Sequence, residues 1–307
     1  MREQVTLTAA MFSLFLSLQG PLWFPQSLQA QAEPFYKGKT VRVIVYSSPG
    51  GLYDVWARLV AQYMKQYIPG EPTLIVQNMT GGGGKIAMNY LYKVAIPDGL
   101  TIGVVPREGY LSQLIGEEGV QYDWAKFTWI GSPEKDTDFI YIRADAPFKD
   151  IYQFIKAKKP PRCGATGVGT TGWVTVKILK ELIGAEIHLV AGYPGGNEID
   201  LAVMRGEVIC RGMATSTHFM REPYLTWHKE GFDRHLVLFG KERDRQTPDT
   251  PTIYEVAEKV GVPKARVAIM DVIGFANNAV RPFVGPPDIP ADRATVLREA
   301  FNETVTS

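Results

Sequence analysis

The segment 41–59 places a buried strand, a glycine turn and the start of a helix in immediate succession. Alternating valines around an isoleucine in 41–45 predict a strand buried on both faces, as in a parallel sheet. Residues 47–51 form a turn without bulky side chains, and helical spacing begins at Asp54. Free backbone N–H groups at the positive end of a helix dipole bind anions. A tight turn without a ligand explains this segment alone equally well.

The same unit of strand, glycine loop and helix recurs at 73–94 and, in the second half of the chain, at 162–183. Ligands bind at the carboxyl edge of open α/β sheets, so two such edges facing each other would form a cleft lined with backbone donors. We therefore expect an α/β fold that binds a small anion. Further strands are expected at 101–105, 139–142, 187–190, 206–213, 236–239, 267–275 and 281–284, and helices at 151–157, 198–204, 253–260 and 290–305.

Two glycine loops match nucleotide-binding motifs only in part. The glycines at 81–84 precede a lysine, but Ile86 and Met79 stand where a P-loop needs Ser or Thr and a further glycine. The loop 167–172 spells Gly-x-Gly-x-x-Gly, but its strand is short and no acidic residue downstream has a convincing ribose-binding context. We therefore expect no nucleotide and no other cofactor.

The histidines give no recognisable catalytic or metal-binding pattern. His188 falls in a predicted strand and is expected in the core, whereas His228 is expected on a solvated helix face. The chain contains no His-x-x-x-His, no Gly-x-Ser-x-Gly and no clustered acidic ligands. We expect a protein that is not an enzyme and holds no metal ion, with an unusual active site as the alternative.

The charge balance and the N-terminus indicate the cellular setting. The 307 residues include 33 basic and 32 acidic side chains, so no basic patch suggests nucleic acid. The apolar run 7–18 and the Ala-Gln-Ala sequence ending at Ala32 are typical of a signal peptide at 1–32, cleaved near Ala32. A membrane anchor is the alternative, but the run is short for a bilayer. We expect the mature protein in the periplasm.

The two cysteines, Cys163 and Cys210, both lie in apolar, strand-like stretches. Export permits a disulfide between them, and two buried thiols explain the pattern equally well. The absence of Cys-x-x-Cys pairs excludes the usual zinc patterns.

A series of short motifs in fixed order resembles the tripartite tricarboxylate transporter receptors, the Bug family of periplasmic solute-binding proteins. Each motif is weak alone, but the ordered set spans nearly the whole mature chain. The motifs are Pro49-Gly50-Gly51 with Asp54 and Ala57-Arg58, Asn78 with the glycines 81–84, Pro97-Asp98-Gly99-Leu100-Thr101, the loop 167–172, Tyr193-Pro194-Gly195-Gly196, Gly206-Glu207-Val208 and Pro248-Asp249-Thr250-Pro251-Thr252.

The resemblance implies a type II periplasmic-binding-protein fold. Two α/β domains would enclose a ligand cleft and be joined by two crossing hinge strands, expected near 139–142 and 236–239. Domain 1 would comprise 33–138 and 240–307, and domain 2 would comprise 139–239.

The resemblance also implies that ligand carboxylates are held mostly by backbone N–H groups and bridging waters. The contacts carried over from the first domain are Ser47, Ser48, Gly51, Tyr53 and Asp54. Those from the second domain are Thr166, Gly169, Thr170 and Thr171, with Tyr193 and Thr215 nearby.

Some positions depart from the family pattern. Arg107 stands where members usually have small polar residues, and its guanidinium could hold a carboxylate bidentately or form a surface ion pair with Glu108. Trp173 stands at a position that is commonly histidine, and it could form an aromatic wall with Tyr53 or pack on its own domain. Thr215 begins a pair that is Asp-Asn in many members, which puts contacts there in doubt.

We therefore expect an exported receptor that captures a small carboxylate, either a di- or tricarboxylate or an aromatic acid, between two domains that close around it. The resemblance implies that a monomeric receptor delivers this ligand to membrane transporter subunits of the tripartite tricarboxylate type. The alternatives are an exported sensory binding protein for a membrane kinase and an exported α/β enzyme acting on a carboxylate. The chain ends at Ser307, earlier than typical members, so the last helix is expected to be incomplete.

Overall fold

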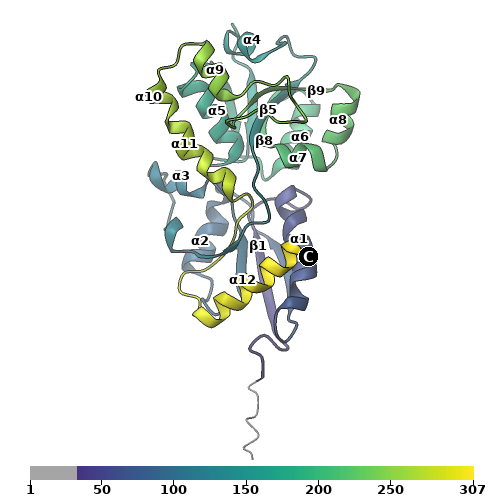
Figure 1. Ribbon diagram of the computed structural model, residues 1–307, viewed down its shortest axis with the longest axis vertical. Coiled ribbons are helices and arrows are strands. Elements are labelled where there is room, and N and C mark those ends of the chain that lie inside the picture. Colours follow the sequence, from purple (N-terminus) through teal and green to yellow (C-terminus); the bar gives the residue numbers. More distant parts are fainter. Residues whose placement is uncertain (1–32) are drawn as a thin grey trace, which may run out of the picture. The chain divides into compact units, whose positions relative to one another are not determined.

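Two five-stranded sheets organise residues 33–307, the part of the chain that this computed structural model describes (Figure 1). The signal peptide predicted for 1–32 lies outside the described residues. Each sheet is covered by helices, and we call a sheet together with its helices a lobe. The first lobe contains the first and last strands of the chain, and the second lobe contains the strands between them.

The first lobe is built on strands β1 (Thr40–Val45), β2 (Thr73–Asn78), β3 (Thr101–Val104), β4 (Thr128–Gly131) and β10 (Phe283–Gly285), in the order β2-β1-β3-β10-β4. β1 pairs in parallel with β2 and β3, whereas β10 runs antiparallel to β3 and β4. Its helices are α1 (Leu52–Met64), α2 (Lys85–Lys93), α3 (Gly109–Leu114) and α12 (Ala291–Thr306), with short 3₁₀ turns η1 (Lys65–Tyr67), η2 (Gly82–Gly84) and η3 (Trp124–Lys126). Val43 and Ile44 pack into different hydrophobic clusters, which confirms the predicted two-sided burial of β1.

The second lobe is built on strands β5 (Asp138–Arg143), β6 (Arg162–Ala165), β7 (His188–Ala191), β8 (Cys210–Ala214) and β9 (Asp233–Leu238), in the order β7-β6-β8-β5-β9. β6 is parallel to β7 and β8, and β5 is antiparallel to β8 and β9. Its helices are α4 (Ile151–Ile155), α5 (Thr171–Glu181), α6 (Gly196–Met204), α7 (Thr215–Met220) and α8 (Tyr224–Glu230). His188, expected in the core, is exposed because β7 is the edge strand of this sheet.

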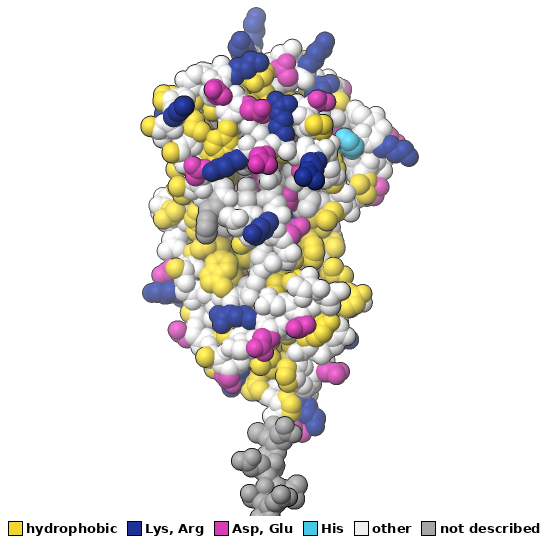
Figure 2. Space-filling model, in the orientation of Figure 1, with side chains coloured by type: hydrophobic (Ala, Val, Ile, Leu, Met, Phe, Trp, Pro, Cys, Tyr) yellow, Lys and Arg dark blue, Asp and Glu magenta, His cyan; other side chains and the backbone are white. Residues whose placement is uncertain are grey.

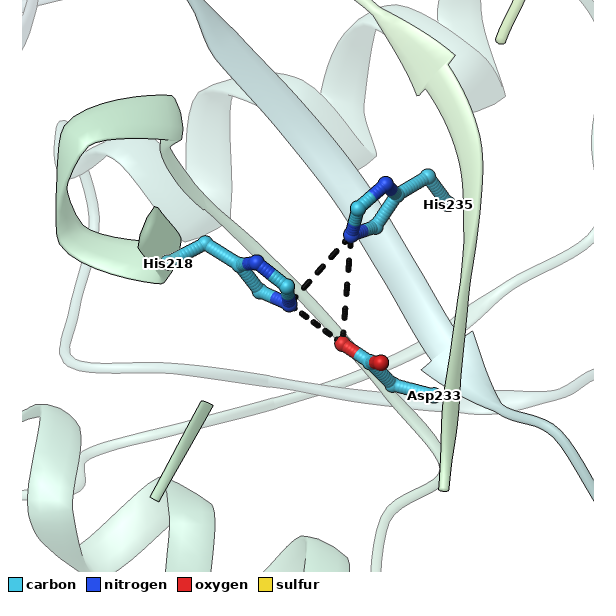
Figure 3. Close-up of side chains that lie close together, drawn as sticks. All are labelled: His218, Asp233 and His235. Atoms are coloured by element: carbon cyan, nitrogen blue, oxygen red, sulfur yellow. Dashed lines mark hydrogen bonds and ion pairs between the residues drawn. The ribbon is translucent and has the colours of Figure 1, made fainter. Parts of the chain in front are cut away.

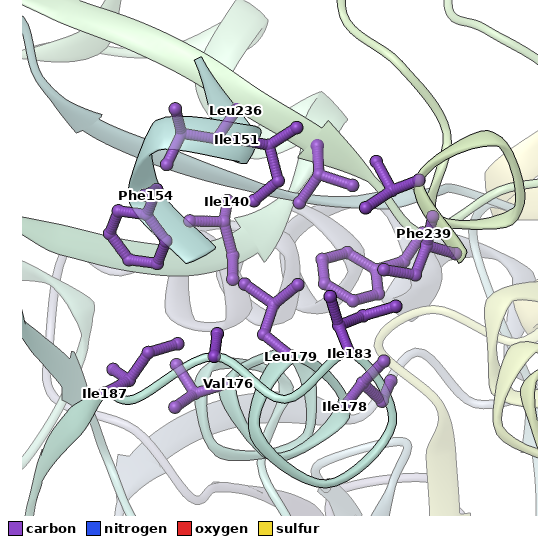
Figure 4. Packing of buried hydrophobic residues seen from close by; sticks show 14 of the residues in the cluster. Ile140, Ile151, Phe154, Val176, Ile178, Leu179, Ile183, Ile187, Leu236 and Phe239 are labelled. Carbon is purple, nitrogen blue, oxygen red and sulfur yellow. The ribbon is translucent and has the colours of Figure 1, made fainter. Parts of the chain in front are cut away.

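The main core of the second lobe lies where α5 packs on the sheet (Figure 4). Ile140 from β5 and Leu179 from α5 are fully buried there. The same cluster includes Val256 and Met270, although the sequence analysis assigned 240–307 to domain 1. These two residues belong to helices α9 (Ile253–Lys259) and α11 (Ile269–Gly274), which flank α10 (Lys264–Val267). The predicted domain boundary at 239/240 stays a prediction, and the packing of 253–270 speaks against it.

Two expectations about this part of the chain are wrong. The strand expected at 267–275 is the end of α10 followed by α11 and the start of η4 (Phe275–Asn278), because its apolar residues contact the core with helical spacing. The second hinge crossing, expected at 236–239, falls instead at 277–280. There the Val280 N–H donates to the Glu134 carbonyl and the Asp136 N–H donates to the Asn277 carbonyl, at 3.2 and 3.1 Å. The two chain segments that connect the sheets are therefore paired with each other.

Cys163 and Cys210 form a disulfide, which settles the alternative that the sequence left open. They occupy directly paired positions on the parallel strands β6 and β8, with their Cα atoms 4.5 Å apart. Both cysteines are fully buried. The bridge ties together the two strands whose carboxyl ends carry the loop 166–170 and helix α7.

The surface mixes charges of both signs. On the face drawn in Figure 2, Lys and Arg side chains lie among Asp and Glu side chains. A single continuous basic area, which binding of nucleic acid would favour, is not seen on that face. Among the helices of residues 33–307, none is both long enough and apolar enough to cross a bilayer.

Thr252 begins α9 with a capping box, and its replacement by alanine should cost about 1 kcal/mol of stability. The Thr252 hydroxyl accepts from the Glu255 N–H at 3.2 Å, and the Glu255 carboxylate accepts from the Thr252 N–H at 2.7 Å. Urea denaturation of Thr252→Ala measures the loss. Thr226→Ala, at an exposed position within α8, is the matched control and should change stability by less than about 0.5 kcal/mol. Equal losses in both variants would contradict the role of the cap.

Candidate functional site

A cavity of about 80 Å³ lies between the two lobes and is lined by residues from both. Its lining residues are Tyr46, Ser47, Gly51, Leu52, Tyr53, Arg107, Val280 and Arg281 from the first lobe and the hinge, and Ala165, Thr166, Thr170, Thr171, Gly172, Gly196, Ile199, Arg211, Gly212, Met213, Ala214, Thr217 and Arg221 from the second.

The carboxyl ends of four strands deliver most of this lining. The turn 46–53 follows β1, Arg107 follows β3, the loop 166–170 follows β6 and helix α7 follows β8. This is the edge at which open α/β sheets bind ligands. The two glycine loops also meet there, because a Cβ added at Gly167 would lie 2.6 Å from the backbone nitrogen of Gly83. Glycine at both positions lets the two lobes approach this closely.

Four arginines line the cavity, and no acidic side chain is among the lining residues of the described chain. Three of them have carboxylate partners outside the lining. Arg107 pairs with Glu108 and Asp138, Arg211 pairs with Asp200, and Arg281 pairs with Glu134. The fourth, Arg221, donates to the Gly50 carbonyl at 3.1 Å and to the Asn197 side chain at 2.6 Å. The cavity surface therefore presents guanidinium donors and no carboxylate oxygens, which favours an anionic ligand.

Apart from Arg281 Nη1, which is paired with Glu134, three buried polar atoms of the lining residues have no hydrogen-bond partner in the described part of the protein: Ser47 Oγ, Arg107 Nη1 and Arg281 Nε. A buried donor left unsatisfied costs about 1–3 kcal/mol, and more when it is charged. A carboxylate has two oxygens that accept several hydrogen bonds, so it could satisfy donors of this kind. The unsatisfied atoms therefore point to an anion with hydrogen-bond acceptors.

Arg281 is a buried cation that lies near a second cation, Arg107. Burial lowers the pKa of its guanidinium to about 10, the positive charge of Arg107 acts in the same direction, and Tyr53 opposes the change. The group remains charged at neutral pH. Its backbone φ of +59° lies in the left-handed region, where a side chain other than glycine is strained. Such strain often occurs at functional sites, and an anion beside Arg281 would relieve its repulsion with Arg107.

Direct contacts hold the lobes together around the cavity. Ser48 Oγ donates to the Glu198 carboxylate at 2.9 Å, and Thr171 Oγ1 donates to the Glu108 carboxylate at 2.7 Å. Arg281 donates to Thr217 Oγ1 at 2.9 Å. These contacts indicate a closed arrangement of the two lobes.

Seven of the residues predicted from sequence line the cavity. They are Ser47, Gly51, Tyr53, Arg107, Thr166, Thr170 and Thr171. Arg107 pairs with Glu108, as the second of its two interpretations predicted, but the pair is buried and does not lie on the surface. The two interpretations of Arg107 are therefore compatible, since the same guanidinium reaches both its carboxylate partners and the cavity.

The other predicted residues lie outside the lining. Ser48 binds Glu198, Gly169 lies against Ser112, Trp173 packs on the second-lobe core, Tyr193 packs on a neighbouring cluster and Thr215 donates to Asp136. Asp54 has a positioning role, because its carboxylate accepts from the Gly50 N–H and from Arg58 and Asn78, each at 2.9 Å. Burial alone would raise the pKa of Asp54, but these hydrogen bonds outweigh it and hold the pKa below its usual value. A direct role of these residues in binding stays a prediction.

Arg211, Arg221 and Arg281 were missed by the sequence reasoning. Two of them carried a usable signal, which is an isolated charge within an apolar stretch. Arg211 lies inside the buried strand β8, and Arg281 lies just before the buried strand β10. A charged side chain in such a position must find a partner, so it marks a candidate site.

Two α/β lobes joined by paired crossing segments around a cavity define a two-domain solute-binding protein. The sequence model of the tripartite tricarboxylate transporter family receptor matches residues 56–282, and the chain therefore belongs to this family. The resemblance stated from the motifs is confirmed. The matched family consists of receptors and not of enzymes.

Similar proteins agree with this assignment. A UPF0065 protein of Bordetella pertussis is 26% identical over 234 residues, which cover 75% of this chain and 69% of the relative. MatC from Rhodopseudomonas palustris, solved with bound malate, has a TM-score of 0.71 at 22% identity and covers 87% of this chain and 84% of its own. A second R. palustris protein, solved with adipate, has a TM-score of 0.62 at 22% identity, with 87% and 82% covered. These structures confirm the predicted binding-protein fold.

Proposed function

We propose that this protein is a periplasmic receptor that binds a small carboxylate between its lobes and delivers it to a membrane transporter of the tripartite tricarboxylate type. The observation that carries the proposal is the cavity lining, with its four arginines and its unsatisfied buried donors. Family membership supports the transport role. Malate and adipate in two similar structures are both dicarboxylates, which supports the same ligand class here.

A dicarboxylate or tricarboxylate fits this lining better than an aromatic monoacid. Arg107 and Arg281 approach from the first lobe and the hinge, whereas Arg211 and Arg221 approach from the second lobe. A ligand with carboxylates at both ends could be contacted by guanidinium groups of both lobes. Binding of that kind stabilises the closed arrangement, because the ligand's contacts are complete only when the lobes meet.

The direct test is a thermal-shift screen of the mature protein against dicarboxylates, tricarboxylates, aromatic acids and amino acids. A ligand at a hundred times its dissociation constant should stabilise the protein by about 2.7 kcal/mol. Stabilisation by di- or tricarboxylates alone supports the proposal. If only amino acids or only aromatic acids stabilise the protein, the proposed ligand class is wrong and the stabilising class replaces it. A folded protein that no acid stabilises would contradict the proposal as a whole.

Arg221→Ala should weaken binding of the ligand found in this screen by about 10- to 100-fold, as expected for loss of a charged hydrogen bond. Arg221 is partly exposed and has no carboxylate partner in the described residues, so the variant should remain folded. Isothermal titration calorimetry gives the affinity. Arg205→Ala removes the same charge from an exposed position outside the cavity and should bind normally. Unchanged affinity in Arg221→Ala would show that Arg221 does not contribute to ligand binding.

The transport role needs a cellular measurement. Deletion of the gene should abolish uptake of the labelled carboxylate. The wild-type gene should restore this uptake. The Arg221→Ala gene should restore it only poorly at low ligand concentration. Uptake that continues unchanged in the deletion strain would contradict delivery to a transporter, even if the purified protein binds the acid.

A further inference from the structure

Three ionisable side chains from one helix and one strand converge inside the second lobe (Figure 3). His218 comes from α7, and Asp233 and His235 come from β9, where their spacing of two places them on the same face of the strand. The two imidazole Nε2 atoms are 3.3 Å apart, and His235 Nε2 is 3.9 Å from Asp233 Oδ2. His218 Nε2 contacts the same carboxylate oxygen. One ligand atom from each residue therefore points to a common centre.

The cluster is closed off from solvent. The side chains of His218 and Asp233 are completely buried, and that of His235 is 7% exposed. Phe139 packs edge-on against His235 with a centroid distance of 4.7 Å, and Tyr224 stacks on His218 at 5.4 Å. His228 also stacks on His235 at 5.6 Å, so aromatic rings surround the two imidazoles and hold their orientations.

No permanently charged cation lies beside the Asp233 carboxylate in the described part of the protein. Asp233 has two imidazoles as its ion-pair partners, with no Lys or Arg recorded beside them among residues 33–307. Its second oxygen, Oδ1, and His218 Nδ1 are buried without a hydrogen-bond partner. A buried carboxylate in this state is costly unless a cation compensates for it.

We propose that His218, Asp233 and His235 bind a divalent transition-metal ion of the zinc class. Zinc–nitrogen and zinc–oxygen bonds of about 2.0–2.1 Å in a tetrahedral site place ligand atoms roughly 3.3 Å apart. The separation of the two imidazole nitrogens matches this value, and the carboxylate has to move away from His218 to admit the ion. Two imidazoles and one carboxylate suit zinc, cobalt, nickel or copper better than magnesium or calcium.

The metal would act on the binding cleft through α7. His218 follows directly after Thr217, which lines the cavity and accepts a hydrogen bond from Arg281. A metal bond between α7 and β9 would therefore fix the helix that carries this part of the cleft. The inferred role is structural, and it is separate from binding of the carboxylate itself.

The test uses the full mature chain with any polyhistidine tag removed, because a tag would bind metal itself. Metal content is measured by mass spectrometry after purification and again after refolding from urea with Zn²⁺, since a closed site can load during folding. We expect one zinc per chain and a melting temperature about 5 °C higher than after removal of the metal with a chelator. Chelated protein refolded with Co²⁺ should show the visible absorption of tetrahedral cobalt, which needs no variant.

Two histidine variants make the result specific. His235→Ala should lose the stoichiometric zinc, the cobalt absorption and the response to chelator. His188→Ala removes a histidine from an exposed strand position and should keep all three. Wild-type protein that refolds with Zn²⁺ but retains less than a tenth of an equivalent, and melts at the same temperature with and without it, would overturn the proposal. The cluster would then be a hydrogen-bonded His-Asp-His group. Zinc that His235→Ala retains would overturn it equally, because the metal would be bound elsewhere.

Discussion

Arg107→Ala is expected to lower the free energy of unfolding by about 3–5 kcal/mol and to abolish carboxylate binding. Arg107 is buried and is the shared partner of the Glu108 and Asp138 carboxylates. Removing it leaves two negative charges close together in the interior without a cation. Burial already raises the pKa of Asp138 to about 7, and the Arg107 guanidinium opposes that rise. The variant would therefore force proton uptake by a carboxyl group or partial opening of the lobes.

Urea denaturation measures the loss, and a second variant separates its two causes. Arg107→Ala combined with Glu108→Gln and Asp138→Asn removes the unpaired charges but not the missing side-chain volume. This triple variant should recover a substantial part of the stability while still failing to bind the carboxylate. Glu108→Gln retains an acceptor for the Thr171 hydroxyl, so the contact between the lobes can persist. A loss below about 1 kcal/mol in Arg107→Ala, or a triple variant no more stable than the single one, would contradict the ionic role of Arg107.

Local patterns predicted the parts of the fold where a short segment decides its own structure. The valines of β1 alternate with residues that pack on the other face. Residues 41–45 alone therefore predicted a strand within a parallel sheet. The turn after β1 and the loop 166–172 could also be predicted, because in each of them small residues are followed by the start of a helix. Seven of the predicted binding residues lie in the cavity lining, and all but Arg107 had been placed by position from the family resemblance.

Features that depend on tertiary partners were not predictable in the same way. The segment 267–275 is apolar enough for a strand, and only its packing on the second-lobe core makes it helical. The crossing at 277–280 is defined by hydrogen bonds to 134–136, which are more than a hundred residues away. The histidine cluster combines residues 15 and 17 positions apart, a spacing that no short metal motif contains. Such sites follow from topology and cannot be found by local spacing.

Removal of the Cys163–Cys210 disulfide is expected to lower the free energy of unfolding by about 4 kcal/mol. The two cysteines are 47 positions apart, and a loop of this length restricts the unfolded chain by about that amount in the chain-entropy model. The bridge joins β6 and β8, which carry Thr166 and Thr217 toward the cavity. Without the bridge, ligand affinity should therefore fall together with stability, because ligand binding would also have to order the cleft.

Urea denaturation of the Cys163→Ala, Cys210→Ala double variant measures the effect, and reduction supplies the control. A dithiol reductant with urea should destabilise the wild-type protein to a similar extent, whereas it should leave the double variant unchanged because that protein has no disulfide to reduce. This comparison separates the bridge from the small loss of sulfur packing, which only the variant suffers. Wild-type protein whose denaturation midpoint is the same with and without reductant, in conditions where free-thiol titration shows two reduced cysteines, would contradict a stabilising disulfide.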